Sequence, residues 1–168
     1  MRPALNFRKW IEEHKSLLKP PVGNAQIWQD TEFMVTVVGG PNTRTDYHVN
    51  EGEEFFYQLE GDIDLKMIEN GKFIDFPIRE GEIFLLPPNI PHSPRRPAGT
   101  LGLVLERQRR PNERDGFLWF CENCGEKLHE EFIHLNDIVK DLPPVFNRFF
   151  GDKNLTTCRK CKTVHQKP

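Results

Sequence analysis

Residues 45–61 read TDYHVNEGEEFFYQLEG, and this stretch decides how the chain folds. A short extended run ends at His48, a turn follows, and Glu54 begins a second extended run. Residues 81–92 read GEIFLLPPNIPH, an apolar strand between a glycine turn and a proline-rich turn, with His92 just beyond the bend. Two imidazoles and one carboxylate therefore lie at the ends of predicted strands.

The residue types at these three positions predict a metal site. Two imidazoles and one carboxylate that leave coordination positions open are the ligands that non-haem Fe(II) uses in reactions with O2. We therefore expect His48, Glu54 and His92 to hold a catalytic Fe(II). Asp46 shares a strand face with His48, so it is expected either to bind the metal or to orient an imidazole.

The composition favours one compact protein with small partners. The 168 residues carry a formal net charge of -2, and 37% of them are hydrophobic, which is enough for a single core. The absence of a basic excess argues against binding to nucleic acid or to a membrane surface. The chain has no apolar run of membrane-spanning length and no apolar secretory signal at its start, which predicts a cytoplasmic protein.

The hydrophobic pattern predicts a helix followed by a β-rich region. Apolar residues recur at helical spacing between residues 7 and 18, before Pro20 and Pro21 end the pattern. Residues 26–108 contain short β-rich runs separated by turns, and Asn70-Gly71 is a strong two-residue hairpin signal. We expect an all-β fold, a closed double-sheet barrel with an N-terminal helix.

The pattern changes again past Pro111. We therefore divide the chain into residues 1–110, the barrel with its helix, and residues 111–168, a small C-terminal lobe packed on the barrel. The lobe is expected to contain two strands and two helical stretches, over residues 117–121, 127–135, 136–141 and 144–150.

All four cysteines lie in this lobe, as Cys121-x-x-Cys124 and Cys158-x-x-Cys161. In a reducing compartment such pairs are better interpreted as metal ligands than as disulfides. Four thiolates predict a closed tetrahedral site for zinc or iron, and the ligand types do not separate the two metals. His165 is an alternative to one of the thiolates.

The two metal-ligand segments resemble the paired motifs of cupins, jelly-roll barrels that hold a metal inside. Six residues separate the glutamate of the first motif from its glycine, five separate the glycine of the second from its proline, and a histidine follows at the expected distance. Two positions depart from the pattern: Asp46, where cupins often have histidine, and Asn89, where glycine is common. Asparagine tolerates a positive φ, and three protein ligands would leave three octahedral positions for a chelating substrate and O2.

Nearly the whole chain resembles the 3-hydroxyanthranilate 3,4-dioxygenase family. The similar stretches are LKPPV at 18–22, VVGGPN at 37–42, RTDYH at 44–48, EFFYQ at 54–58, LLP at 85–87, PHSP at 91–94 and ERQ at 106–108. Carried over by position, the resemblance implies metal binding by His48, Glu54 and His92, substrate-carboxylate binding by Arg44 and Arg96, O2 binding near Arg44, and catalytic contact of Glu106 with the substrate. It also implies a rubredoxin-like site at the four cysteines.

The resemblance implies that Fe(II) and O2 open the ring of 3-hydroxyanthranilate between its hydroxyl and carboxyl carbons. The product would be 2-amino-3-carboxymuconate semialdehyde, a quinolinate precursor that links tryptophan degradation through the kynurenine pathway to NAD biosynthesis. A homodimer is implied as well. Acidic residues beside the cysteines, Glu122 and Glu126, argue against nucleic acid as a partner.

Other activities remain open alternatives to this one. A zinc-dependent cupin isomerase would need a phosphate-binding cluster, and no such cluster is evident near His92. A non-catalytic ligand-binding cupin would not need two arginines and an acid around an open metal. The loop over residues 19–24 is either a lid over the site or a simple helix stop.

Overall fold

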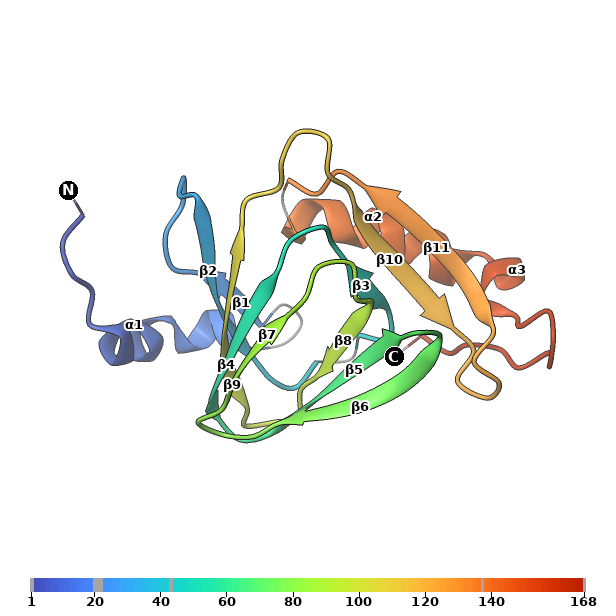
Figure 1. The fold of residues 1–168 in the computed structure, drawn as a ribbon, viewed down its shortest axis with the longest axis horizontal. Coiled ribbons are helices and arrows are strands. Elements are labelled where there is room, and N and C mark those ends of the chain that lie inside the picture. Colours follow the sequence, from blue (N-terminus) through green and yellow to red (C-terminus); the bar gives the residue numbers. More distant parts are fainter. Residues whose placement is uncertain (1, 20–22, 43, 137, 168) are drawn as a thin grey trace.

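The computed structural model describes residues 2–19, 23–42, 44–136 and 138–167, and its strands form two facing sheets (Figure 1). All neighbouring strands run antiparallel. The five-stranded sheet contains, in spatial order, β1 (Asn24–Gln26), β2 (Phe33–Gly39), β9 (Leu101–Arg107), β4 (Glu54–Glu60) and β7 (Ile83–Leu86). The six-stranded sheet contains β11 (Lys127–Ile133), β10 (Asp115–Phe120), β3 (Tyr47–Val49), β8 (His92–Arg95), β5 (Ile63–Glu69) and β6 (Lys72–Ile78). The predicted double-sheet β architecture is confirmed.

The predicted turn chemistry is also confirmed. Asn70 and Gly71 have φ of 50° and 74° and join β5 to β6, where Glu69 pairs with Lys72. Positive φ at both central residues is the conformation whose twist matches a two-residue hairpin. Asn89, the predicted substitute for glycine, has a φ of 63°.

Apolar side chains fill the space between the sheets. On β4 the buried positions alternate, so that Glu54, Phe56 and Gln58 point inward while the residues between them face outward. Phe56 packs against side chains of β5, β6 and β7 in one cluster. Each fully buried side chain of this kind contributes about 1.5–3 kcal/mol. The two polar members of the inward row therefore occupy positions that packing alone would give to apolar residues.

The predicted N-terminal helix is α1 (Phe7–His14), which continues as the 3₁₀ helix η1 (Lys15–Leu18). The Asn6 side chain caps α1 by accepting a hydrogen bond from the backbone N–H of Lys9 at 3.0 Å. Trp10 and Leu18 are buried against Val37 and its neighbours on the five-stranded sheet. The helix thus covers one part of the outer face of that sheet and leaves the β4–β7 side open.

The C-terminal segment extends the six-stranded sheet. The expected strands are β10 and β11, and β10 pairs with β3, so that Phe117 lies opposite His48. Helix α2 (Ile138–Gly151) covers β10 and packs on Phe117 and Trp119 (Figure 1). A short helix, α3 (Lys153–Thr156), follows. The boundary near residue 110 stays a prediction.

The two expected helical stretches overlap with α2, but the expected break between them is wrong, because α2 is one continuous helix that contains Pro143 and Pro144. Leu142, Val145 and Phe149 all lie on its buried side in one cluster with β10. Burial of this apolar face offsets the backbone hydrogen bonds that the prolines remove.

Among the described residues, no helix combines the length and the apolar character that crossing a bilayer requires. The suggested lid over residues 19–24 falls mostly on residues 20–22, which lie outside the described residues.

Candidate active site

The two predicted histidine ligands come from neighbouring strands. His48 on β3 and His92 on β8 are direct partners in the antiparallel pairing, so their side chains leave the sheet on the same face. Their rings lie 5.2 Å apart between centroids. The third residue, Glu54, begins β4 on the facing sheet. The site therefore bridges the two sheets of the barrel.

The three side chains converge on one point. Oε1 of Glu54 lies 3.4 Å from Nδ1 of His48 and 3.4 Å from Nε2 of His92. One potential ligand atom from each of the three residues lies within 4.8 Å of the other two. Two imidazoles and one carboxylate in this arrangement fit a divalent transition metal such as Fe(II), and three protein ligands leave positions for other molecules.

Hydrogen bonds fix which ring nitrogen each histidine presents. Nε2 of His48 donates to Oδ2 of Asp115 at 2.6 Å, and Nδ1 of His92 donates to the carbonyl oxygen of Ile90 at 2.9 Å. The Ile90 carbonyl has no proton to donate. The Asp115 carboxylate is ionised, because hydrogen bonds from His48 and Arg109 lower its pKa although burial alone would raise it. Nδ1 of His48 and Nε2 of His92 therefore face Glu54 and are the nitrogens that a metal ion would bind after displacing any proton there.

The electrostatics of the triad favour charged groups. Burial alone would raise the pKa of Glu54, but the charge and hydrogen bonds of His92 and His48 outweigh it and hold that pKa well below its usual value. Burial alone would lower the pKa of His48, whereas hydrogen bonds to Asp115 and Glu54 raise it to about 9. A metal ion would replace the positive charge that a proton supplies in its absence.

Metal binding is expected to tighten with pH. The proton on His48 stabilises the metal-free fold fully below pH 6.5, and this contribution is lost as pH rises through about 9. Because the metal must displace that proton, we expect the affinity of the triad for Zn(II) to rise about tenfold per pH unit between pH 7 and about 9. Competition with a chromophoric chelator, after the four-cysteine site is filled, measures this. A flat affinity over that range would contradict it.

Among the described residues, the side-chain hydrogen bonds of Asp46 go to Arg44 and not to an imidazole. Its buried carboxylate accepts two hydrogen bonds from Arg44, from Nε at 3.0 Å and from Nη2 at 2.5 Å. The guanidinium of Arg44 also lies 5.8 Å from the centre of the Phe146 ring on α2. Asp46 thus holds Arg44 in place and Asp115 is the carboxylate that is hydrogen-bonded to His48, while the two roles considered for Asp46 stay predictions.

Arg96 is a buried cation without a carboxylate partner among the described residues. Its residue is 3% exposed, Nη1 donates to Oε1 of Gln58 at 3.2 Å, and Nε has no hydrogen-bond partner there. Burial lowers the pKa of Arg96 to about 10. Gly102 provides its space, because a Cβ at that position would lie 2.7 Å from Nη1. A guanidinium held in this way is suited to an anionic group entering the barrel.

Glu106 lies directly opposite Glu54 in the pairing of β9 with β4. Oε2 of Glu106 accepts hydrogen bonds from Nη1 of Arg109 at 2.5 Å and from Nδ2 of Asn50 at 3.3 Å. Burial and the charge of Glu54 raise the pKa of Glu106 to about 7. Among the described residues, Oε1 of Glu106 has no hydrogen-bond partner.

Glu106 also lines a cavity of about 450 Å³, a size typical of sites for small molecules. Met34 and Thr36 on β2 form one wall, and the stretch from His134 to Asn136 forms another. The cavity thus lies between the five-stranded sheet and the C-terminal segment and extends to Glu106, the strand partner of Glu54.

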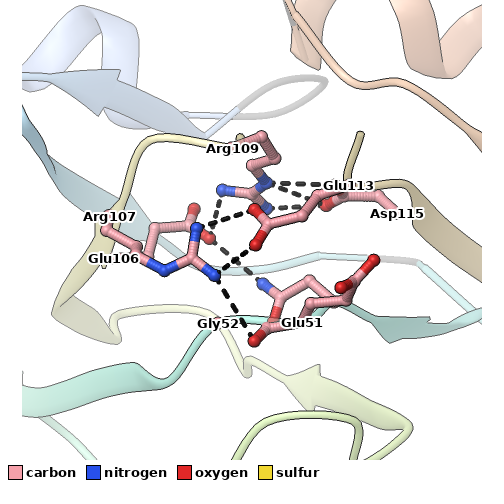
Figure 2. Close-up of a pocket in the computed structure, with 8 residues that line it drawn as sticks. Glu51, Gly52, Glu106, Arg107, Arg109, Glu113 and Asp115 are labelled. Carbon is pink, nitrogen blue, oxygen red and sulfur yellow. Dashed lines mark hydrogen bonds and ion pairs between the residues drawn. The ribbon is translucent and has the colours of Figure 1, made fainter. Parts of the chain in front are cut away.

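Three residues of this site were missed in the sequence: Asn50, Arg109 and Asp115. Asn50 joins the two carboxylates, because its Nδ2 also donates to Oε1 of Glu54 at 2.8 Å. Figure 2 shows Arg109 between Glu106 and Asp115. The signal for Arg109 was present in the arginine-rich stretch after Glu106, which needs acidic partners if it is buried.

The four cysteines form a second cluster away from the barrel interior. Sγ of Cys121 lies 3.4 Å from Sγ of Cys161, and Sγ of Cys124 lies 3.6 Å from Sγ of Cys158. These separations exclude disulfides, whose S–S length is about 2.0 Å, and approach the roughly 3.8 Å between sulfurs in a tetrahedral site with bonds of about 2.3 Å. His165 is not part of the cluster, since its Nε2 is hydrogen-bonded to Thr45.

Comparisons with known proteins agree with this geometry. The family model described as 3-hydroxyanthranilic acid dioxygenase matches residues 1–150. A 3-hydroxyanthranilate 3,4-dioxygenase of Ruegeria pomeroyi is 56% identical over 163 residues, 96% of this chain and 91% of that protein. One of Xanthomonas euvesicatoria is 55% identical over 166 residues, 99% of this chain and 94% of that protein.

A solved structure supports the fold independently. A cupin-2 domain containing protein from Shewanella frigidimarina superposes with a TM-score of 0.50 at 15% identity, covering 62% of this chain and 95% of the other. At that identity the likeness concerns the fold alone, which is the cupin fold. The family model, the relatives that match nearly the full chain and the His48–Glu54–His92 triad agree with this fold. The chain therefore belongs to the 3-hydroxyanthranilic acid dioxygenase family.

Proposed function

We propose that this protein is a 3-hydroxyanthranilate 3,4-dioxygenase that uses Fe(II) and both atoms of O2 to form 2-amino-3-carboxymuconate semialdehyde. The observation that carries the proposal is the convergence of His48, Glu54 and His92 in a barrel that also holds Arg96, a buried guanidinium with no carboxylate partner among the described residues. Iron held by the triad would supply the redox chemistry that O2 needs to react with an aromatic ring.

The substrate carboxylate would bind to Arg44 and Arg96. Guanidinium groups make charge-assisted and often bidentate hydrogen bonds to carboxylates. Asp46 holds Arg44 in a fixed orientation, and the positive charge of Arg44 would also favour O2 binding. Arg96 has unused donors inside the barrel. Fixing the carboxylate orients the ring so that its hydroxyl and amino groups face the triad.

Glu106 would accept a proton or hydrogen bond from the substrate hydroxyl or amino group. Its Oε1 is available, because both hydrogen bonds described for this carboxylate fall on Oε2. A pKa of about 7 allows Glu106 to take up and release a proton near neutral pH. Deprotonation of the substrate makes its ring more electron-rich, which favours reaction with O2.

Anaerobic reconstitution with Fe(II), followed by air and 3-hydroxyanthranilate, tests the proposed function. We expect uptake of one O2 per substrate molecule together with the absorbance of the semialdehyde product. Protein loaded with Zn(II) at the triad is the matched control and is expected to show neither. Folded, iron-loaded protein without turnover would sink the proposal and favour a zinc-dependent isomerase or a non-catalytic cupin.

The four-cysteine site would hold iron or zinc in a structural role. Each Cys-x-x-Cys pair belongs to a tight backbone turn, in which the N–H groups of Gly125 and Lys162 donate to the carbonyl oxygens of Cys121 and Cys158, four residues earlier. Four thiolates complete a tetrahedral ion and leave no position for a substrate. Elemental analysis of the purified protein distinguishes the two metals.

The homodimer expected from the resemblance would use the open face of the five-stranded sheet. Phe33, Ile83 and Leu85 are exposed there, Ile83 to 65%, and β7 is an edge strand. We expect Leu85→Lys to convert a dimer to a monomer in sedimentation velocity. Phe132→Lys, at an exposed apolar residue of the other sheet, is the control expected to stay dimeric. A monomeric parent protein would contradict the proposal.

A further inference from the structure

Arg109 contacts two acidic residues of the site with a single guanidinium group. Nε and Nη2 donate to Asp115, the latter at 2.6 Å, and Nη1 donates to Glu106 at 2.5 Å (Figure 2). The side chain of Arg109 is 9% exposed and that of Asp115 is 1% exposed. The small space among these residues is about 10 Å³, at the lower limit for one water molecule. The contact is therefore closely packed and direct.

These contacts belong to a closed ring of side chains. Asp115 accepts from Nε2 of His48, and Glu106 accepts from Asn50, which also donates to Glu54. The ring closes where Glu54 meets His48 at 3.4 Å. Within this ring, Arg109 links Asp115, the carboxylate that is hydrogen-bonded to His48, to Glu106.

We propose that Arg109 is a positioning residue for ring cleavage, acting through Asp115 on His48 and directly on Glu106. Its fork fixes Asp115 so that the His48 proton stays on Nε2 and Nδ1 faces the metal position. The same fork occupies Oε2 of Glu106 and leaves Oε1 directed to the substrate. The role of Arg109 toward Glu106 and the substrate rests on the proposed function, whereas its role in orienting His48 for metal binding does not.

A purely structural role for Arg109 is already filled by its neighbours. Arg107 forms a bidentate pair with Glu113 at 2.7 and 2.6 Å, and Glu113 also accepts from the backbone N–H of Arg110. These bonds close the turn between β9 and β10. Arg109 instead turns inward from this turn, toward the ligands.

The test compares Arg109→Met and Arg109→Lys with Arg110→Met, whose wild-type side chain is 76% exposed. With Zn(II) at the triad, ¹⁵N-resolved NMR reports whether the His48 proton resides on Nε2, and chelator competition reports metal affinity. We expect the Nε2–H proton of Arg109→Met to exchange faster with solvent, which broadens its signal, and the variant to bind metal about 10- to 100-fold more weakly. Lysine lacks the fork, so Arg109→Lys is expected to rescue neither readout. Arg110→Met is expected to match the wild type.

In the iron-loaded enzyme, kcat of Arg109→Met is expected to fall about 10- to 100-fold with KM changed less than threefold. If Arg109→Met does not fold, Asp115→Asn takes its place with the same expectations. An unchanged His48 signal and metal affinity in the folded variants would overturn the proposal. Since neither of those readouts needs turnover, they decide the proposal even if the wild type proves inactive with 3-hydroxyanthranilate.

Discussion

His92→Ala is expected to lower kcat/KM for 3-hydroxyanthranilate at least a thousandfold. His92 presents Nε2 toward Glu54, and its ring is fixed by the Ile90 carbonyl, so the substitution removes one of the three ligands of the triad. A metal ion contributes several kcal/mol of transition-state stabilisation, and about 4 kcal/mol corresponds to a thousandfold in rate. Oxygen uptake after anaerobic loading with Fe(II) measures the effect.

The matched control for this prediction is His14→Ala. His14 is a histidine at the end of α1, stacked on Trp10 at 4.2 Å between ring centroids and remote in sequence from the triad. This variant is expected to keep wild-type turnover and iron content. More than a tenth of wild-type activity in His92→Ala would show that the triad is not the catalytic metal site.

Arg96→Met is expected to raise KM for 3-hydroxyanthranilate without lowering stability. The loss of a buried charge pair with the substrate corresponds to about 2–5 kcal/mol, or roughly 30- to 5,000-fold in KM. In the free protein, Arg96 is a buried cation with no carboxylate partner among the described residues, so an apolar replacement is expected to leave the free energy of unfolding unchanged or up to about 2 kcal/mol higher. Steady-state kinetics and urea unfolding measure the two effects.

A substrate without the carboxylate distinguishes the loss of carboxylate binding from a general disturbance of the barrel. 2-Aminophenol keeps the adjacent hydroxyl and amino groups but has nothing for Arg96 to bind. Wild type and Arg96→Met are therefore expected to turn over 2-aminophenol at similar rates. Equal losses with both substrates would show that Arg96 supports the barrel rather than the carboxylate.

Local sequence patterns predicted the elements whose causes are local. The hairpin at Asn70-Gly71 and the positive φ of Asn89 follow from the conformations that these residues tolerate. The triad could be predicted because each ligand lies in or at the start of a short strand next to a recognisable turn. The cysteine cluster could be predicted because two residues in each pair are held by one tight turn.

Features that depend on distant pairing could not be predicted in this way. Asp115 is 67 residues from His48 in sequence, and only the pairing of β10 with β3 brings them together. Without that pairing, Asp46 was the nearest carboxylate and the natural candidate. The prolines in α2 misled for a related reason: their local effect on a helix is unfavourable, whereas the burial of Val145 and Phe149 is a property of the folded chain.

Strand β10 has a consequence for how separable the two predicted metal sites are. It begins at Asp115, behind the catalytic histidine, and ends at Phe120, immediately before Cys121, so that roughly 20 Å of extended backbone joins them. A chain that ended before this strand would lose three things together. These are the four cysteines, the Asp115 carboxylate that is hydrogen-bonded to His48, and the Phe146 ring that lies next to Arg44. The C-terminal segment thus cannot be exchanged or deleted by itself, because it supplies residues that surround the predicted catalytic site.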